Sequence, residues 1–386
     1  IHNVLCRALM PTIVTSLALT SFTASAAEIV KLQNNTALDA AGAWVGGVVP
    51  TAADVMLWDS TYGTPAAATT LSQLGASTAV AGLKVTNVGG TLNLGSTMVG
   101  FQNTSSGSTL TIGSLGIDLS NATQGLFMSS AIKLDADQTW NIKNANTATS
   151  PMGLNNNEDL GMIAQIANVP FNLNGKTLTF SGLGQSTISS GYLFSNGTIN
   201  VNNNLLVIQG GTNRLTTVGA DVSMSVSATN QLRLQSNSGA ITSSAPTSVN
   251  GTLNLLNNNS ANAVTLNGNL TLNHGCTLSI GHAQNGAVNI TGSVATSGTI
   301  AMTVFGTNAI TTSTATTVPL SANISGAITG SGNINLSNTS NAANGKANNI
   351  RLSGNNSGYT GTFTIGGSAN RGVRLATANS GSSAAT

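Results

Sequence analysis

Neighbouring carboxylates are the residues of this sequence most able to carry out chemistry. Asp135 and Asp137 are two positions apart, which places both on one side of an extended segment, and Glu158 and Asp159 are adjacent. Paired carboxylates act as general acid and base in sugar-cleaving enzymes, and they also hold Ca²⁺. The alternatives are a polar turn after Leu134 for the first pair and a solvated loop for the second. We favour these structural interpretations and predict no catalytic residue in the chain.

The remaining acidic residues are scattered. Asp54 and Asp59 bracket a strand-like segment, residues 55–58, and we expect both to make structural hydrogen bonds. The chain has ten acidic residues, and none lies between residues 222 and 386. A Ser/His/Asp triad has no support either, because no Asp is placed to orient any of the three histidines. Nearly half of the protein therefore lacks a carboxylate for acid–base chemistry.

One group of residues has the composition of a metal site. His274, Cys276 and His282 lie within nine positions, and His and Cys are the ligands that zinc prefers. However, Cys276 shares its parity with Leu278 and Ile280, which favours a small core residue in an inward-facing row. We expect the two histidines to lie in turns on either side. The sequence therefore predicts no metal and no cofactor.

Three tryptophans could form a platform on which sugar rings stack. Trp44 and Trp58 lie in an apolar N-terminal segment, and Trp140 alternates with Ile142. These surroundings favour burial of all three rings in the core.

Charge is scarce and unevenly distributed. Only 6% of the 386 residues are charged, and 12 Lys and Arg against 10 Asp and Glu give a net charge of +2. This is too little positive charge for an electrostatic nucleic-acid binder. Arg351, Arg371 and Arg374 could form a small basic patch that contacts an anionic surface polymer, although we favour scattered, solvated charges.

The N-terminal segment has the pattern of a secretory signal peptide, which we assign to residues 1–26. A short cationic start ends at Arg7, an apolar stretch covers residues 8–22, and small residues stand at Ala24 and Ala26. No later stretch reaches the roughly 20 apolar residues of a membrane-spanning helix. We therefore predict export, no transmembrane span in the mature chain, and a single remaining cysteine with no internal disulfide.

The rest of the chain repeats one unit, in which two apolar residues flank a polar one and a cluster of Gly, Asn or Ser follows. This alternation predicts short strands with one apolar face. Examples are Leu110/Ile112, Ile132/Leu134, Leu178/Phe180, Ile199/Val201, Leu232/Leu234, Leu253/Leu255, Val264/Leu266, Leu278/Ile280, Val288/Ile290 and Ile334/Leu336. We expect residues 27–79 to form an N-terminal cap or lead-in and residues 80–386 to form the repetitive body.

The polar face of these strands carries Asn, Ser and Thr in place of charged residues. In a parallel β-helix each coil stacks on the last, so like charges would repel along a column, whereas stacked amides and hydroxyls attract. Gly and Asn suit the tight corners. The sequence therefore predicts an all-β, right-handed parallel β-helix of roughly 12–15 coils, at about 20–25 residues per coil.

A shorter motif, Gly-Thr-apolar-x-apolar, recurs within this body at uneven spacing. Its copies begin at Gly90, Gly197, Gly251, Gly298 and Gly361. The repeat is therefore degenerate, with turns of variable length between similar strands.

Several segments resemble bacterial autotransporter-associated β-strand repeat proteins. The similar segments are residues 110–120, 132–142 and 175–182, the repeat-like residues 352–367, and residues 44–59, which are similar to the cap of such proteins. The resemblance implies a passenger-like β-helix, exported to the bacterial surface, with adhesive or structural roles and no catalytic residues to carry over. No membrane barrel follows the repeats, so we expect the sequence to be a fragment of a longer chain, with any membrane anchor outside it.

These observations favour a secreted or cell-surface structural or adhesive protein that is not an enzyme. Its partner would be a surface polysaccharide or the surface of a host or neighbouring cell. One alternative is a carbohydrate-active β-helix enzyme, a polysaccharide lyase or hydrolase. The other is an ice- or surface-binding solenoid that uses the pairs Thr109/Thr111, Thr177/Thr179 and Thr362/Thr364.

Overall fold

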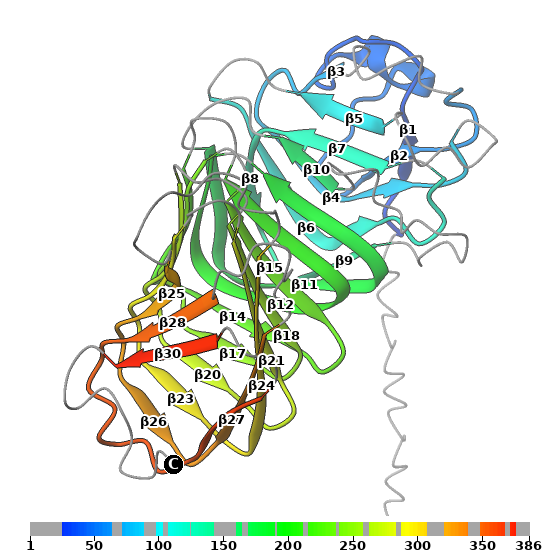
Figure 1. The fold of residues 1–386 in the computed structure, drawn as a ribbon. Helices are drawn as coiled ribbons and strands as arrows, with labels where there is room; N and C mark the ends of the chain where they lie inside the picture. The colour runs from blue at the N-terminus through cyan, green and yellow to red at the C-terminus, as the bar shows by residue number, and fades with distance from the viewer. Residues whose placement is uncertain are drawn as a thin grey trace, which may run out of the picture.

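The protein is a parallel β-solenoid of about ten turns, as shown by a computed structural model (Figure 1). The structure describes residues 25–63, 72–88, 98–102, 107–123, 125–142, 160–163, 169–189, 191–210, 215–236, 239–257, 262–282, 287–306, 320–338, 348–366 and 371–375. The predicted all-β parallel β-helix is confirmed. Every pairing between two strands is parallel, and each strand pairs with one a full coil away in sequence.

The strands form three stacks, which we call the first, second and third sheets in the order in which a coil visits them. Four strands turn corners and contribute to more than one sheet: β4 (Thr78–Val85) and β6 (Thr109–Asp118) to the first and second, β11 (Val169–Ser189) and β12 (Tyr192–Gly210) to all three.

The other members of the first sheet are β8 (Ala131–Leu134), β13 (Thr216–Val218), β16 (Ile241–Ser243), β19 (Ala263–Leu266), β22 (Ala287–Ile290), β25 (Leu320–Ile324), β28 (Asn348–Leu352) and β30 (Arg371–Leu375). Those of the second sheet are β1 (Glu28–Val30), β2 (Val55–Trp58), β9 (Gln138–Asn141), β14 (Val222–Val226), β17 (Thr247–Val249), β20 (Leu270–Leu272), β23 (Val294–Thr296) and β26 (Ile328–Gly330).

Those of the third sheet are β3 (Ser72–Gln73), β5 (Met98–Gln102), β7 (Gly125–Ser129), β10 (Leu160–Ile163), β15 (Gln231–Ser236), β18 (Thr252–Asn257), β21 (Thr277–His282), β24 (Thr299–Gly306), β27 (Asn333–Asn338) and β29 (Phe363–Ile365). Three copies of the Gly-Thr motif, at Gly251, Gly298 and Gly361, lead into strands of this sheet, and the copy at Gly197 lies in the second sheet within β12. The copy at Gly90 lies outside the described residues.

Coil length varies more than the sequence suggested. Leu178 pairs with Ile199, 21 residues further along, whereas Trp140 pairs with Phe180, 40 residues further along. The expectation of roughly 12–15 coils was therefore too high. Uniform coils of about 20–25 residues do not allow for excursions between strands, which lengthen a coil without adding a turn.

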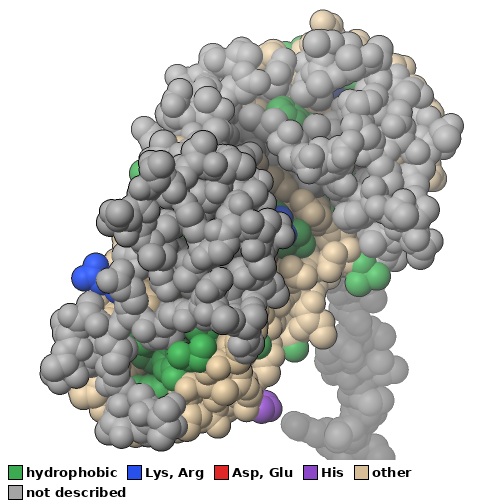
Figure 2. All heavy atoms as spheres, in the orientation of Figure 1, with side chains coloured by type: hydrophobic (Ala, Val, Ile, Leu, Met, Phe, Trp, Pro, Cys, Tyr) green, Lys and Arg blue, Asp and Glu red, His purple; other side chains and the backbone are tan. Residues whose placement is uncertain are grey.

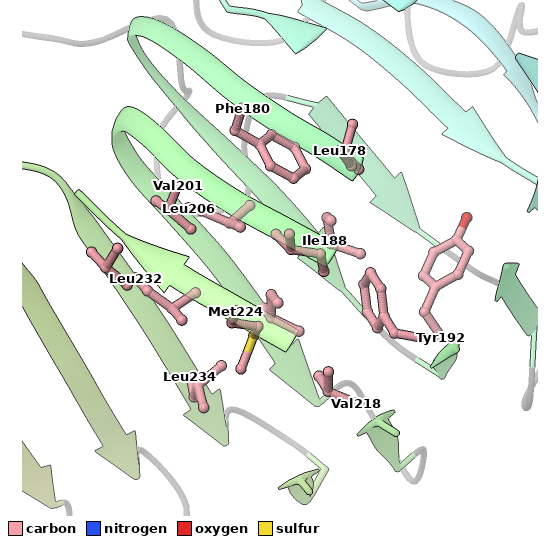
Figure 3. Packing of buried hydrophobic residues seen from close by; sticks show 14 of the residues in the cluster. Leu178, Phe180, Ile188, Tyr192, Val201, Leu206, Val218, Met224, Leu232 and Leu234 are labelled. Atoms are coloured by element: carbon pink, nitrogen blue, oxygen red, sulfur yellow. The ribbon is translucent and has the colours of Figure 1, made fainter. Parts of the chain in front are cut away.

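The apolar member of each predicted pair points into the solenoid and is buried. Phe180, Ile199, Leu232 and Leu234 are all fully buried, and Figure 3 shows side chains from successive coils converging on the interior. Because the strands are in register, similar side chains stack: the rings of Phe171 and Phe194 lie 4.7 Å apart. One continuous core follows from this stacking.

One corner of the coils is built from stacked glycines, namely Gly268, Gly292, Gly326 and Gly354. A Cβ added to Gly292 would lie 2.1 Å from the carbonyl oxygen of Gly268, and one added to Gly326 would lie 1.8 Å from that of Gly292. Backbones of successive coils thus approach too closely here for any side chain. The predicted role of Asn at other corners is confirmed by the positive φ of Asn174 (55°) and Asn196 (57°).

The parallel stack begins within the segment predicted as the cap, because β1 pairs with β2 and β2 with β4. Two short 3-10 turns, η1 (Ala41–Ala43) and η2 (Val45–Gly47), follow β1. Lys31 is fully buried nearby, where its ammonium donates to the carbonyl oxygens of Leu32 (2.7 Å) and Asn34 (2.9 Å) and to Oδ1 of Asn34 (3.0 Å).

Candidate functional site

The carboxylate pair Asp135 and Asp137 lies in an exposed turn between β8 and β9, as the structural interpretation predicted. Asp137 Oδ1 accepts a hydrogen bond of 2.7 Å from the backbone N–H of Thr177, which belongs to the next coil. This carboxylate therefore ties two coils together. Glu158 and Asp159 lie outside the described residues.

Asp54 and Asp59 make the structural hydrogen bonds expected of them. Asp54 Oδ2 accepts from the backbone N–H and the hydroxyl of Thr51, at 2.9 and 2.7 Å, and these bonds lower the pKa of Asp54. Asp59 Oδ1 accepts from the N–H and the hydroxyl of Thr61, at 2.8 and 2.6 Å. Both carboxylates stabilise turns that flank β2.

Four further carboxylates have similar structural partners. Asp39 accepts from the N–H of Ala76 at 2.8 Å, Asp118 from that of Ser120 at 2.9 Å, and Asp221 from that of Asn196 at 2.8 Å. Glu28 forms an ion pair of 2.8 Å with Lys84, which raises the pKa of Lys84. Seven described carboxylates are thus committed to turns or to contacts between coils, and sequence alone gave no partner for these last four.

The potential zinc ligands are not brought together as a site. Cys276 is fully buried, as predicted, and burial raises the pKa of its thiol to about 11. His274 lies in the predicted turn, where its Nδ1 accepts from the N–H of Thr299 at 3.0 Å. His282 was predicted in a turn but is the last residue of β21, because pairing with Asn257 and Gly306 extends the strand. Within the described ranges, no three His, Cys, Asp or Glu side chains form a group that could hold a metal.

The three tryptophans are buried, as predicted, with relative exposures of 1% or less. Trp44 Nε1 donates to the carbonyl oxygen of Leu38 at 2.8 Å, and Trp140 Nε1 donates to Gln138 Oε1 at 2.8 Å. These rings offer no external stacking platform for a sugar.

The predicted threonine pairs lie on different faces. Thr109 and Thr111 belong to the first sheet, Thr177 and Thr179 to the second, and Thr364 to the third. They therefore do not tile one surface.

Two of the three C-terminal arginines are adjacent. The register of the first sheet pairs Arg351 on β28 with Arg374 on β30, and the Arg351 side chain is exposed. Arg371 is three positions before Arg374 on the same strand, so the alternation of the strand assigns it to the opposite face. The predicted patch of three arginines is therefore reduced to a stacked pair.

Comparison with known proteins identifies no relative: no family model, no curated protein and no solved structure matches the chain. Among the described residues, no helix has the length and apolar character needed to cross a membrane.

Proposed function

We propose that this protein is an exported, non-enzymatic β-solenoid that acts as a structural or adhesive element at the bacterial surface. The observation that carries the proposal is the use of its carboxylates. Asp54, Asp59, Asp118, Asp137 and Asp221 each accept hydrogen bonds from a turn or a neighbouring coil. Acidic groups that hold the scaffold together are not arranged as an acid–base pair around a bond to be cleaved.

The outer surface supports the same proposal. Polar side chains bond from coil to coil, as in the contacts Thr198 to Ser223 (3.0 Å) and Ser225 to Asn200 (2.7 Å). On the face drawn in Figure 2, the coloured surface is dominated by uncharged polar atoms and backbone. A long, neutral and regularly spaced surface suits a spacer or an adhesive stalk.

The export part of the proposal rests on the signal-peptide pattern of residues 1–26 and on the resemblance to autotransporter-associated repeat proteins. Expression of the full sequence in a Gram-negative host, followed by fractionation and treatment of intact cells with protease, tests it. We expect the chain outside the cytoplasm and with the N-terminal segment removed. Retention of an uncleaved chain in the cytoplasm would contradict export.

The non-enzymatic part is tested separately. Purified protein is incubated with polygalacturonate and alginate, and new reducing ends and unsaturated products are measured. We expect no turnover. Turnover that disappears in Asp135→Ala or Asp137→Ala would show that the turn between β8 and β9 is catalytic and would overturn the proposal.

A further inference from the structure

The first sheet carries one central outward-facing residue on each of its later strands, and these residues stack in register. They form a column of Thr217, Thr242, Thr265, Asn289, Asn323, Arg351 and Arg374. The residues on either side of each position point inward and are buried, as Val264 and Leu266 flank Thr265. Adjacent strands lie about 4.8 Å apart, so the column presents a polar group at each such step.

The column differs from the polar columns of the second sheet. There the side chains satisfy one another, as Thr198 does with Ser223 and Asn200 with Ser225. In the described part of the first sheet, the structure gives no hydrogen bond to the side chains of Thr242, Thr265 or Asn289. These hydroxyl and amide groups remain partly exposed and available to an external ligand.

The lower end of the column carries two like charges in register. Arg351 pairs with Arg374 across neighbouring strands, an arrangement that is unfavourable without a counter-charge. Among the residues described after Asp221, the structure contains no carboxylate that could supply one. A solenoid whose other columns avoid stacked charge therefore holds a cation pair that an external anion would stabilise.

We propose that this column binds a linear acidic polysaccharide built from uronic acids. A sugar carboxylate fits the planar guanidinium of Arg351 through paired hydrogen bonds, and the hydroxyl groups of successive sugars fit the threonine and asparagine side chains. Beside the column, Ala263 and Ala287 pair in register and leave a flat strip for sugar rings. Two cations and no exposed aromatic platform are a poor match for a nucleic acid.

The inference rests on the proposed function for one point only, since a polymer of this kind meets the protein outside the cell. Its test uses purified full-length chain and does not depend on export. Binding to polygalacturonate is measured by calorimetry at low salt, with dextran as the neutral polymer and dextran sulfate as the sulfated one. We expect binding to polygalacturonate that weakens as salt is added, and no binding to dextran.

Variants locate the site. Arg351→Gln is expected to weaken binding about tenfold, whereas Arg233→Gln, which removes the same charge from β15 of the third sheet, leaves it unchanged. Thr265→Val removes one hydroxyl from the column and is expected to weaken binding about threefold, while its matched control on the second sheet, Thr271→Val, has no effect. Melting curves of all four variants show that each remains folded.

Three results would overturn the inference. Equal binding of dextran would show that charge is not recognised, and preferential binding of dextran sulfate would show that the anion is not a carboxylate. An equal loss in Arg351→Gln and Arg233→Gln would show that attraction is a property of overall charge and not of the column.

Discussion

At the scale of single residues, the glycine corner sets the limit on what the coils tolerate. In Gly292→Ala the new Cβ would meet the carbonyl oxygen of Gly268 at 2.1 Å, a backbone atom that cannot move without shifting a coil. We expect a loss of roughly 2–4 kcal/mol in the free energy of unfolding. The control is Gly366→Ala, where the nearest atom lies at 3.8 Å, and we expect less than about 1 kcal/mol there. Equal losses in urea unfolding would contradict close stacking.

Lys31 gives the protein a defined dependence on pH. Burial lowers the pKa of Lys31 from 10.5 to about 8. Between these values the unfolded chain holds a proton that the folded chain has released, so the free energy of unfolding rises with pH across this window. Below pH 8 the lysine is charged in both states, and the cost of burying it is fully present.

Comparison with Lys31→Met isolates this effect, because other titrating groups are shared by both proteins. We expect the difference in unfolding free energy between the two to change from pH 8 to 10.5 and to stay constant below that range. Lys133→Met, at a partly exposed position on β8, serves as the control and leaves the rise in place. A difference that is independent of pH would show that Lys31 is not the source.

At the scale of strands, the low charge of the sequence is tested by stacking charge on purpose. Ser248 and Thr271 face outward on neighbouring strands of the second sheet and pair in register. In a double-mutant cycle, Ser248→Asp with Thr271→Asp is expected to cost about 0.5–1 kcal/mol beyond the sum of the single changes. Ser248→Lys with Thr271→Asp should show coupling of the opposite sign. Because both positions are near the surface, added salt should reduce both couplings.

The same comparison of columns shows how far a sequence specifies such a fold. Period-two alternation identifies strands and their inward residues, since whether Leu253 or Asn254 faces the core depends only on local order. Register between coils is non-local. It depends on the length of each excursion, so the partners of Arg351 and the three sheets that separate the threonine pairs were not predictable. For the same reason the backbone partners of Asp137 and Asp221 were missed, because each lies in a neighbouring coil.

At the scale of the whole molecule, a solenoid in which each coil contacts its neighbours is expected to open locally. Cys276 reports such opening, since its thiol is buried and reacts with a thiol reagent only when its coil opens. Cys6 is replaced by Ser so that the signal is unique. Leu253→Ala removes a core side chain from β18, which stacks directly on β21 beside Cys276, and Leu83→Ala makes the same change far away on β4.

Each substitution should cost roughly 2–5 kcal/mol in its own coil, because both leucines are buried. If stability is a sum of contacts between neighbouring coils, labelling of Cys276 accelerates in Leu253→Ala and is unchanged in Leu83→Ala. Equal acceleration in both variants would mean that the solenoid opens as one cooperative unit. A binding column that crosses seven strands of the first sheet would then be formed or lost as a whole, whereas local opening allows its arginine end to loosen while its threonine end stays ordered.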